Sequence, residues 1–276
     1  MHVFHTVSKE CFDWLSRQKS VKEESLTDWL LYRVSQLTPC VQYLTFTRNE
    51  EASIGADWEW WIITKDCCEK RKCAYRFLVQ AKKLHPMKDN YPGLAYCNRN
   101  GLQIDLLYEA AKQRRAMPLY ILYSANRPDY REQRIHMPNE YCDMLLKWCR
   151  SCINGVYFTS VYQIRELLFS QPRPQIPDQS ILNRSLGLSV LDRFLFDRKE
   201  LRHMRYYADE PFGKRFCNAI DNAANNRYFE EDFPVYLSVL LREGIANCAQ
   251  WFESEYEQGS HGISDLAGVV IVDLTD

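Results

Sequence analysis

The 276-residue chain lacks several features that would place it in a specialised class of protein. No segment approaches the ~18 consecutive apolar residues of a membrane span, so we expect no membrane-spanning helix. Lys and Arg number 35 against 36 Asp and Glu, a formal charge of −1, so any surface for nucleic acid must be local. Residues 1–20 contain no uninterrupted apolar stretch followed by a small-residue cleavage site, so we expect no signal peptide.

A regular disulfide framework is also missing. The 11 cysteines are odd in number and irregularly spaced, which in a long chain is typical of buried free thiols in a reducing cytoplasm. Cys67, Cys68 and Cys73 lack a paired CxxC or a His partner, so a zinc site is the weaker interpretation. We therefore expect a cytoplasmic protein, and its 46% hydrophobic composition is sufficient for a full core.

The pattern up to residue 125 predicts an α/β (α+β) fold. Ser25, followed three residues later by Asp28, resembles a capping box and predicts a helix that begins near Leu26. Hydrophobic periodicity then predicts the following order: strands 40–47, 57–64 and 75–84, helix 102–115 and strand 119–125. Short connections favour an antiparallel meander of the first three strands, and the helix before the fourth allows a crossover onto the same sheet.

The second half of the chain is less regular. We expect further elements at 138–152 (helix), 155–161 (strand) and 162–170 (helix). The segment "QPRPQIPDQ" contains three prolines and reads as a linker, which divides the chain into a core of residues 1–170 and a mainly helical lobe of residues 171–276.

The last predicted strand, residues 268–274, is apolar until Asp273 and needs burial on both faces. We expect it to return to the N-terminal sheet, or to form a small second sheet with residues 155–161. Residues 253–276 carry six acids and no Lys or Arg, so this stretch would repel nucleic acid. We expect it to lie away from a nucleic-acid cleft or to act as a gate over it.

Three polar side chains converge in the predicted hairpin. Asp57 opens one strand, and Gln80 and Lys82 lie two residues apart on the next, hence on one face. A buried amide and ammonium side by side are costly unless they serve a purpose. Asp57 can bind Mg²⁺ or Mn²⁺, and Gln80 can supply a neutral oxygen ligand or orient a metal-bound water. Lys82 can polarise the attacking water or neutralise a phosphoryl group, which is chemistry for metal-assisted phosphodiester hydrolysis.

These residues, in this element order, resemble the PD-(D/E)XK nuclease superfamily. Its αβββαβ core carries an acid on the second strand, matched by Asp57 in "GAD", and a (D/E)-X-K triplet on the third. "QAK", with Gln80 and Lys82, matches the Gln variant found in the Mrr-like branch of restriction endonucleases. The resemblance covers residues 24–125 and implies a restriction-endonuclease-like core with a mixed sheet flanked by helices. It also implies an Mg²⁺ or Mn²⁺ cofactor.

The resemblance implies further acids at the site. Relatives place a Glu on or near the first helix, for which Glu24 is the nearest match and Glu23 and Asp28 are the alternatives. Glu51, in the loop before Asp57, resembles an additional metal-binding acid.

Some relatives also carry a Gln and a Tyr four residues apart on the second helix. Here Gln103 and Tyr108 are five apart, roughly 140° round a helix, so we retain only Gln103 as a substrate contact.

A basic segment lies beside these residues. Between Lys65 and Lys88 there are eight Lys or Arg and two acids, a local charge of +6. Arg76 and Lys83 belong to it, and we expect both to bind substrate phosphates. A solvated hairpin is an equally good interpretation of such a run.

The residues and the resemblance together predict a metal-dependent endonuclease that cuts double-stranded DNA in restriction or anti-phage defence. We expect Asp57, Gln80, Lys82 and Glu24 to be catalytic. The expected partners besides DNA are a second copy of the chain or a defence-system protein. The alternatives are a catalytically inactive module that binds nucleic acid or protein on the same fold, an RNase, or a structural subunit.

Overall fold

The computed structural model describes residues 2–46, 54–65, 72–85, 87–129, 151–170, 178–192, 229–230, 233–245, 247–248, 251, 254 and 266–275. The helices are α1 (Val3–Arg17), α2 (Glu23–Leu37), the 3₁₀ turn η1 (Pro92–Ala95), α3 (Gln103–Gln113), α5 (Val161–Phe169), α6 (Asp178–Leu182) and α10 (Val235–Glu243). The strands are β1 (Val41–Thr45), β2 (Trp58–Lys65), β3 (Lys72–Lys83), β4 (Cys97–Asn98), β5 (Gly101–Leu102), β6 (Met117–Tyr123), β7 (Val156–Ser160), β8 (Leu186–Gly187), β9 (Phe229–Glu230) and β10 (Gly268–Asp273).

One mixed sheet organises the described part of the chain. Its strands follow the order β1-β10-β2-β3-β6-β7-β8, and β9 pairs with β3. The β10–β2 and β3–β6 pairs are parallel and the others antiparallel. A parallel neighbour requires a crossover, which α3 provides between β3 and β6. The predicted α+β class is therefore confirmed, and the chain order α2, β1, β2, β3, α3, β6 follows the sequence prediction.

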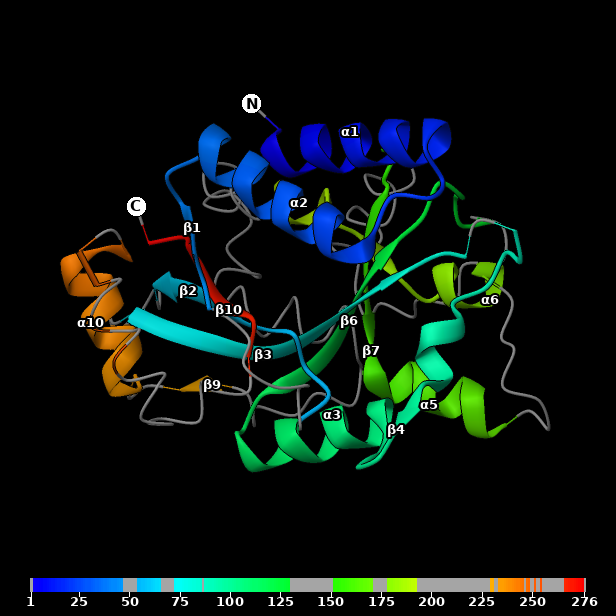
Figure 1. Cartoon of the computed structure of the whole chain (residues 1–276). Coiled ribbons are helices and arrows are strands. Elements are labelled where there is room, and N and C mark those ends of the chain that lie inside the picture. The colour runs from blue at the N-terminus through cyan, green and yellow to red at the C-terminus, as the bar shows by residue number, and fades with distance from the viewer. Residues whose placement is uncertain are drawn as a thin grey trace, which may run out of the picture.

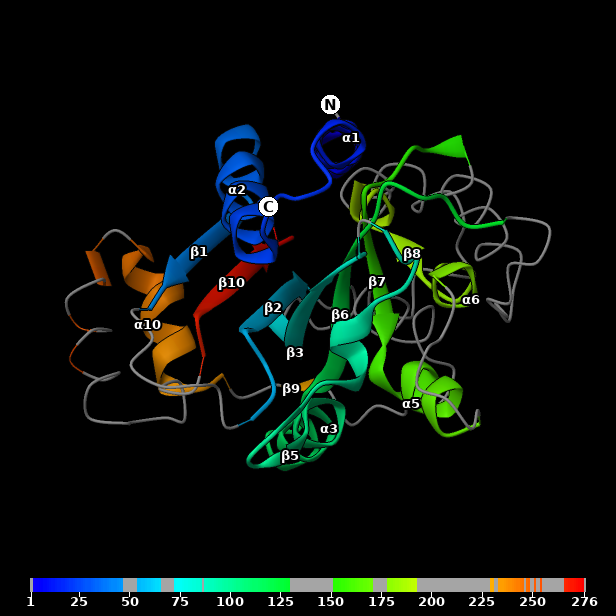
Figure 2. The ribbon, with the colours of Figure 1, turned by 45° about the vertical axis from the view of Figure 1, so that its right-hand side comes forward.

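Helices cover both faces of this sheet (Figures 1 and 2). On one face, side chains such as Phe77 of β3 share a core with Leu30 of α2 and with α1. On the other, Leu78 of β3 shares a core with Leu107 of α3 and with α5. Alternate residues of β3 therefore face different helices. The predicted site depends on this pleat, because it places Gln80 and Lys82 on one face.

The last strand lies inside the sheet. β10 pairs antiparallel with β1 (Val270 opposite Tyr43) and parallel with β2 (Val270 opposite Trp60). The predicted meander of the first three strands is therefore wrong, because β10 separates β1 from β2. A second sheet with residues 155–161 is not formed either, since β7 pairs with β6 in the same sheet. The apolar sequence of β10 explains its place, because a strand without polar side chains is most stable between two neighbours.

The first turn of α2 differs from the prediction. The helix begins at Glu23 with Lys22 as its N-cap, so Ser25 is inside the helix and is not the cap. Glu23 and Glu24 occupy the first turn, where negative side chains are favoured by the helix dipole. The preceding segment contains α1, whose buried residues include Val7 and Cys11.

Other expectations fall on parts of the chain outside the described residues. These parts are most of the predicted helix 138–152 and of the linker 171–179. Three described strands of residues 171–276, namely β8, β9 and β10, pair within the main sheet. No helix among the described residues has the length and apolar character needed to cross a membrane.

Candidate active site

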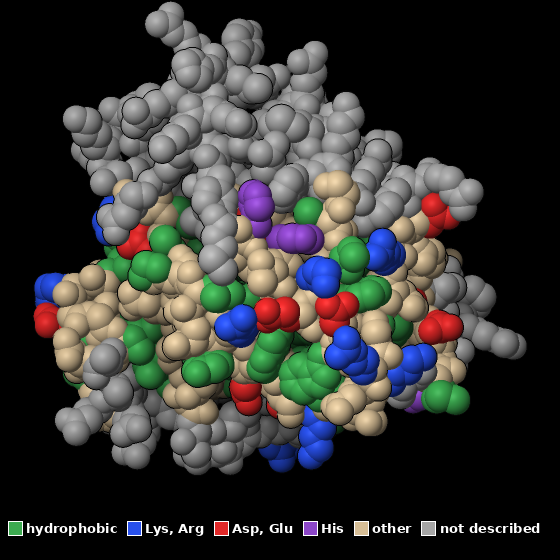
Figure 3. Space-filling model, turned by 90° about the horizontal axis from the view of Figure 1, so that it is seen from above, with side chains coloured by type: hydrophobic (Ala, Val, Ile, Leu, Met, Phe, Trp, Pro, Cys, Tyr) green, Lys and Arg blue, Asp and Glu red, His purple; other side chains and the backbone are tan. Residues whose placement is uncertain are grey.

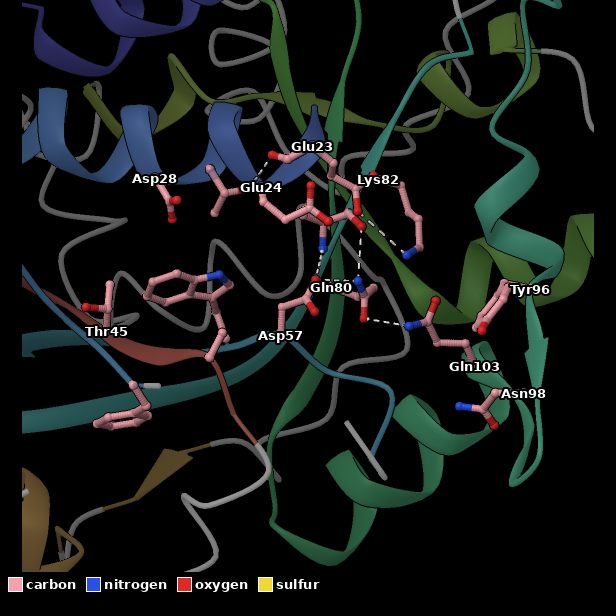
Figure 4. Close-up of a pocket in the computed structure, with 15 residues that line it drawn as sticks. Glu23, Glu24, Asp28, Thr45, Asp57, Gln80, Lys82, Tyr96, Asn98 and Gln103 are labelled. Carbon is pink, nitrogen blue, oxygen red and sulfur yellow. Dashed lines mark hydrogen bonds and ion pairs between the residues drawn. The ribbon is translucent and has the colours of Figure 1, made fainter. Parts of the chain in front are cut away.

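A cavity of about 600 Å³ opens beside the start of β2 and the end of β3, and we call it the site cavity. It is bounded by α2 on one side and by the N-terminus of α3 on the other (Figure 4). It is lined by Glu23, Glu24, Thr27, Asp28, Thr45, Phe46, Asp57, Trp58, Gln80, Ala81, Lys82, Tyr96, Asn98, Gln103 and Ala267.

Asp57 is fixed by its backbone immediately before β2. Its N–H donates to Val79 O (2.9 Å) and its carbonyl accepts from Ala267 N (2.6 Å). Two residues earlier, Gly55 has a φ of +69°, and a Cβ there would lie 2.5 Å from Gln103 O. A glycine is needed at this close approach, because it lets the turn that carries Asp57 pack against the first residue of α3.

Asp57, Gln80 and Gln103 form a chain of hydrogen bonds. The Asp57 carboxylate accepts from the Gln80 side-chain amide and from Ala81 N (3.2 Å). Gln80 Oε1 in turn accepts from Gln103 Nε2 (3.0 Å). Gln80 is only 2% exposed, so its amide is buried and satisfied. Gln80 thus joins β3 to α3 and to the turn that leads into β2.

Lys82 reaches the same cavity from the end of β3. Its aliphatic stem packs against η1, where a Cβ on Gly93 would lie 2.9 Å from Lys82 Cδ. Its Nζ lies 3.8 Å from Glu23 Oε1.

Glu23 is thus the acid of α2 that lies beside Lys82. Its Oε2 accepts the Lys83 N–H at 2.6 Å. Burial raises the pKa of Glu23 to about 7, although Lys82 acts in the opposite direction, and the Asp57 carboxylate raises it further. A carboxyl group with this pKa changes its charge near neutral pH.

The preferred candidate, Glu24, and its alternative Asp28 line the cavity but are more exposed. Burial, together with the charge of Glu24, raises the pKa of Asp28. Figure 4 shows all three acids on α2 above Asp57 and Gln80. Sequence reasoning named Glu23 only as an alternative, and a helix assigned to begin near Leu26 left both Glu23 and Glu24 outside its first turn.

Arg76 and Lys83, expected to bind substrate, are not among the described residues that line the cavity. Arg76 Nε donates to Glu59 Oε1 at 2.6 Å, and the guanidinium lies over the Trp61 ring at 5.2 Å. Arg76 shares a face with Gln80 but lies four residues earlier, roughly 13 Å along the strand. Arg76 therefore belongs to a buried cluster with Glu59 and Trp61, outside the site cavity.

Lys83 lies on the other face of β3, as the pleat predicts. Its Nζ donates to Lys19 O (2.7 Å) and to Val21 O, which holds the connection between α1 and α2. Burial lowers the pKa of Lys83, with Glu23 acting in the opposite direction. The ammonium is thus used to fasten the backbone that leads to Glu23.

Glu51 and residues 66–71 of the basic segment lie outside the described residues. On the face that carries α1 and α2, acidic and basic side chains of the described residues are interspersed (Figure 3). That view shows no continuous basic stripe over the described part of this face.

The oxygen donors at the site suit a hard cation that keeps much of its water. The described residues contain no group of three or more His, Cys, Asp or Glu arranged to hold a metal ion. However, the Asp57 carboxylate and the Ala81 carbonyl both accept a hydrogen bond from Gln80 Nε2, so these two oxygen donors lie close to each other. Mg²⁺ is commonly bound through one or two carboxylates with several retained waters, so this donor set fits a single Mg²⁺ or Mn²⁺.

The cavity rim contains residues that the sequence did not single out. Tyr96, which is 46% exposed, and Asn98 reach it from the short β4–β5 hairpin. The turn sequence "NRNG" at 98–101 is a signal for such a hairpin. Ala267 precedes β10 and could not be placed without knowing where that strand pairs.

The fold and the site together define a mixed α/β protein with four carboxylates, three side-chain amides and a lysine lining one cavity. The chain belongs to a family of unknown function, DUF6615, whose model matches residues 1–264. Comparison with curated proteins gave no match. Comparison with solved structures gave none either.

Proposed function

We propose that the protein is a Mg²⁺- or Mn²⁺-dependent endonuclease that hydrolyses phosphodiester bonds in double-stranded DNA. The observation that carries this proposal is the meeting of Asp57, Gln80 and Lys82 in one cavity, with Glu23 beside Lys82. These side chains come from three separate elements. Their convergence gives a carboxylate for a cation and an ammonium for a phosphate in the same space.

Each residue has a role in such a reaction. Asp57 would hold the cation, which when bound supplies positive charge to the phosphate and lowers the pKa of a bound water. Lys82 presents its ammonium to the same space and stabilises the negative charge that develops on the phosphoryl oxygens. Glu23, at 3.8 Å, orients Lys82 when ionised.

The element order supports assignment to the PD-(D/E)XK superfamily, and to its Gln-containing Mrr-like branch. The acid precedes β2, the Gln-X-Lys triplet ends β3, and α3 leads from β3 to β6. On this proposal the protein works in the cytoplasm in restriction or anti-phage defence, as a homodimer or with a defence-system partner. Cys11, Cys40, Cys97, Cys152 and Cys248 are free thiols, which supports a reducing compartment.

The test is a cleavage assay with the purified full-length protein. Supercoiled plasmid, linear double-stranded DNA, single-stranded DNA and RNA are each incubated with Mg²⁺, with Mn²⁺ and with EDTA. The proposal expects cation-dependent cuts in plasmid DNA. Cleavage of RNA alone would identify an RNase instead, and cation-dependent binding without cleavage would identify an inactive binding module.

A further inference from the structure

A pair of side-chain amides lies behind Asp57. Gln80 Nε2 donates both to the Asp57 carboxylate and to the Ala81 carbonyl, the latter at 3.1 Å. Two acceptors on this side fix the nitrogen of Gln80 there, since its oxygen would be repelled by both. The oxygen of Gln80 therefore faces Gln103, whose Nε2 donates to it at 3.0 Å (Figure 4).

The far end of this pair has unused hydrogen-bonding capacity. Gln103 Oε1 is buried and accepts no hydrogen bond from any residue that the structure describes. A buried acceptor without a partner is costly, and such groups in proteins call for an explanation. Here the adjacent group is the amide of Gln80, which could donate to Gln103 if both amides were turned.

The orientation of Gln80 matters for any cation. As the amide stands, its N–H group occupies the place between Asp57 and the Ala81 carbonyl. That group donates a hydrogen bond to the carboxylate in the absence of a cation, and it offers a cation no ligand. Turning the amide would put Gln80 Oε1 beside two other oxygens, an arrangement that is favourable only when a cation joins them.

We infer that Gln80 and Gln103 form a coupled amide switch that links cation binding to the direction of their shared hydrogen bond. Without a cation, Gln103 donates to Gln80. With a divalent cation, both amides are turned, Gln80 presents its oxygen to the cation, and Gln103 Oε1 accepts from Gln80 Nε2. The terminal torsion of a Gln side chain is broad and roughly two-fold, so the heavy atoms need to move little. Gln103 is thus a positioning residue that acts through Gln80.

The inference rests on the proposed function in one respect, because it takes Asp57 as the ligand of a divalent cation. It does not require that any nucleic acid is cut. Cation affinity therefore tests it separately from cleavage.

The experiment measures Mn²⁺ affinity of the full-length protein by isothermal titration calorimetry and by electron paramagnetic resonance of free Mn²⁺. Gln103→Glu can only accept, so it penalises the cation-free orientation and supports the turned one. We expect Mn²⁺ to bind roughly three- to tenfold more tightly, the equivalent of one net hydrogen bond. A carboxylate in the first turn of α3 favours the helix, so this variant should fold, and thermal unfolding checks that it does.

The matched control is Asn98→Asp, which adds the same charge to the cavity lining without a bond to Gln80. Its gain in affinity should be clearly smaller than that of Gln103→Glu. Gln103→Met removes both the donor and the acceptor, so its affinity should stay within about twofold of wild type, because each orientation loses one bond.

A direct readout comes from selective ¹⁵N labelling of glutamine. Mg²⁺ should shift the side-chain amide signals of both Gln80 and Gln103, and Asp57→Asn should abolish the shifts. Equal affinity gains for Gln103→Glu and Asn98→Asp, an unshifted Gln103 signal, or an Mn²⁺ affinity that Asp57→Asn leaves unchanged would each overturn the switch. If the switch holds and no substrate is cut, only the endonuclease proposal fails.

Discussion

Replacing Glu59 by Ala tests whether the ion pair of Glu59 with Arg76 stabilises the fold, rather than leaving Arg76 to bind substrate. Glu59 is fully buried. Its carboxylate accepts from Arg76 Nε (2.6 Å), from Trp61 Nε1 (3.0 Å) and from the hydroxyl of Tyr236. The cluster joins β2 and β3 to α10, whose Tyr236 is 175 residues from Trp61 and 177 from Glu59 in sequence.

The expected loss follows from what the substitution leaves behind. The Arg76 side chain is 11% exposed and would keep its charge without its carboxylate partner. Breaking a buried ion pair by removing one partner costs about 3–5 kcal/mol. The Trp61 and Tyr236 donors would lose an acceptor as well, so we expect Glu59→Ala to lower the free energy of unfolding by at least about 3 kcal/mol. That is a large part of the ~5–15 kcal/mol that stabilises a typical domain.

Urea unfolding followed by tryptophan fluorescence and circular dichroism measures this loss. Lys9→Ala is the control, because it removes an ion pair with Asp13 whose side chains are 47% and 45% exposed, and such pairs contribute less than about 1 kcal/mol. Tyr236→Phe removes one donor and should cost about 1–2 kcal/mol if α10 packs on the sheet. A Glu59→Ala protein as stable as Lys9→Ala would refute the reasoning and would return Arg76 to the list of substrate-binding candidates.

Three further results are expected. Lys82→Ala should abolish most cleavage in a protein that still folds, whereas Lys83→Ala should keep the rate per folded molecule. Equal losses of rate would contradict the assigned faces of β3. Deletion of residues 266–276 removes four buried Val or Ile side chains of β10, about 6–12 kcal/mol of apolar burial, so the protein should be insoluble or unfolded rather than melt at the wild-type temperature. The folded protein raises the pKa of Glu23 from 4.5 to about 7 and so binds the proton more tightly than the unfolded chain. The free energy of unfolding of the cation-free protein should then fall as pH rises across that interval, and Glu23→Gln should flatten this slope; an unchanged slope would mean that Glu23 is not buried as described.

The sequence predicted the parts of the site that depend on local period. Gln80 and Lys82 are two residues apart on a strand, so their common direction follows from the pleat alone. Gln103 opens a helix with a clear apolar stripe, so its approach to the end of β3 follows from the crossover between β3 and β6. These relations need only the element order, which the periodicity supplied.

Long-range pairing was not accessible in the same way. Nothing in "GVVIVDL" specifies which two strands it separates, because an apolar strand is stable between any two neighbours. The placement of Ala267 in the cavity depends on that choice. Arg76 was assigned to substrate as a member of the basic segment 65–88, and only the tertiary structure shows that Arg76 pairs with Glu59, which also accepts from Tyr236.

The start of α2 was predicted wrongly for a local reason. Ser25 and Asp28 resemble a capping box, but the backbone N–H of Leu26 already donates to Lys22 O, so the helix has begun before Ser25. Because the helix starts about one turn earlier than predicted, Glu23 is inside its first turn and lies beside Lys82. Helix ends are the least certain feature of any sequence-based assignment, and here the site depends on one.

The most direct test of the endonuclease proposal compares wild type with Asp57→Asn in Mg²⁺-dependent nicking of supercoiled plasmid. The substitution keeps the size of the side chain and removes its negative charge, so thermal unfolding should show a folded protein. The account predicts nicking by wild type with Mg²⁺ and none with EDTA. The loss in the variant should exceed the ~10- to 100-fold that is typical when only an outer-shell partner of a metal ligand is removed, because Asp57 would itself be the ligand. A folded Asp57→Asn protein that nicks plasmid at the wild-type rate would contradict it.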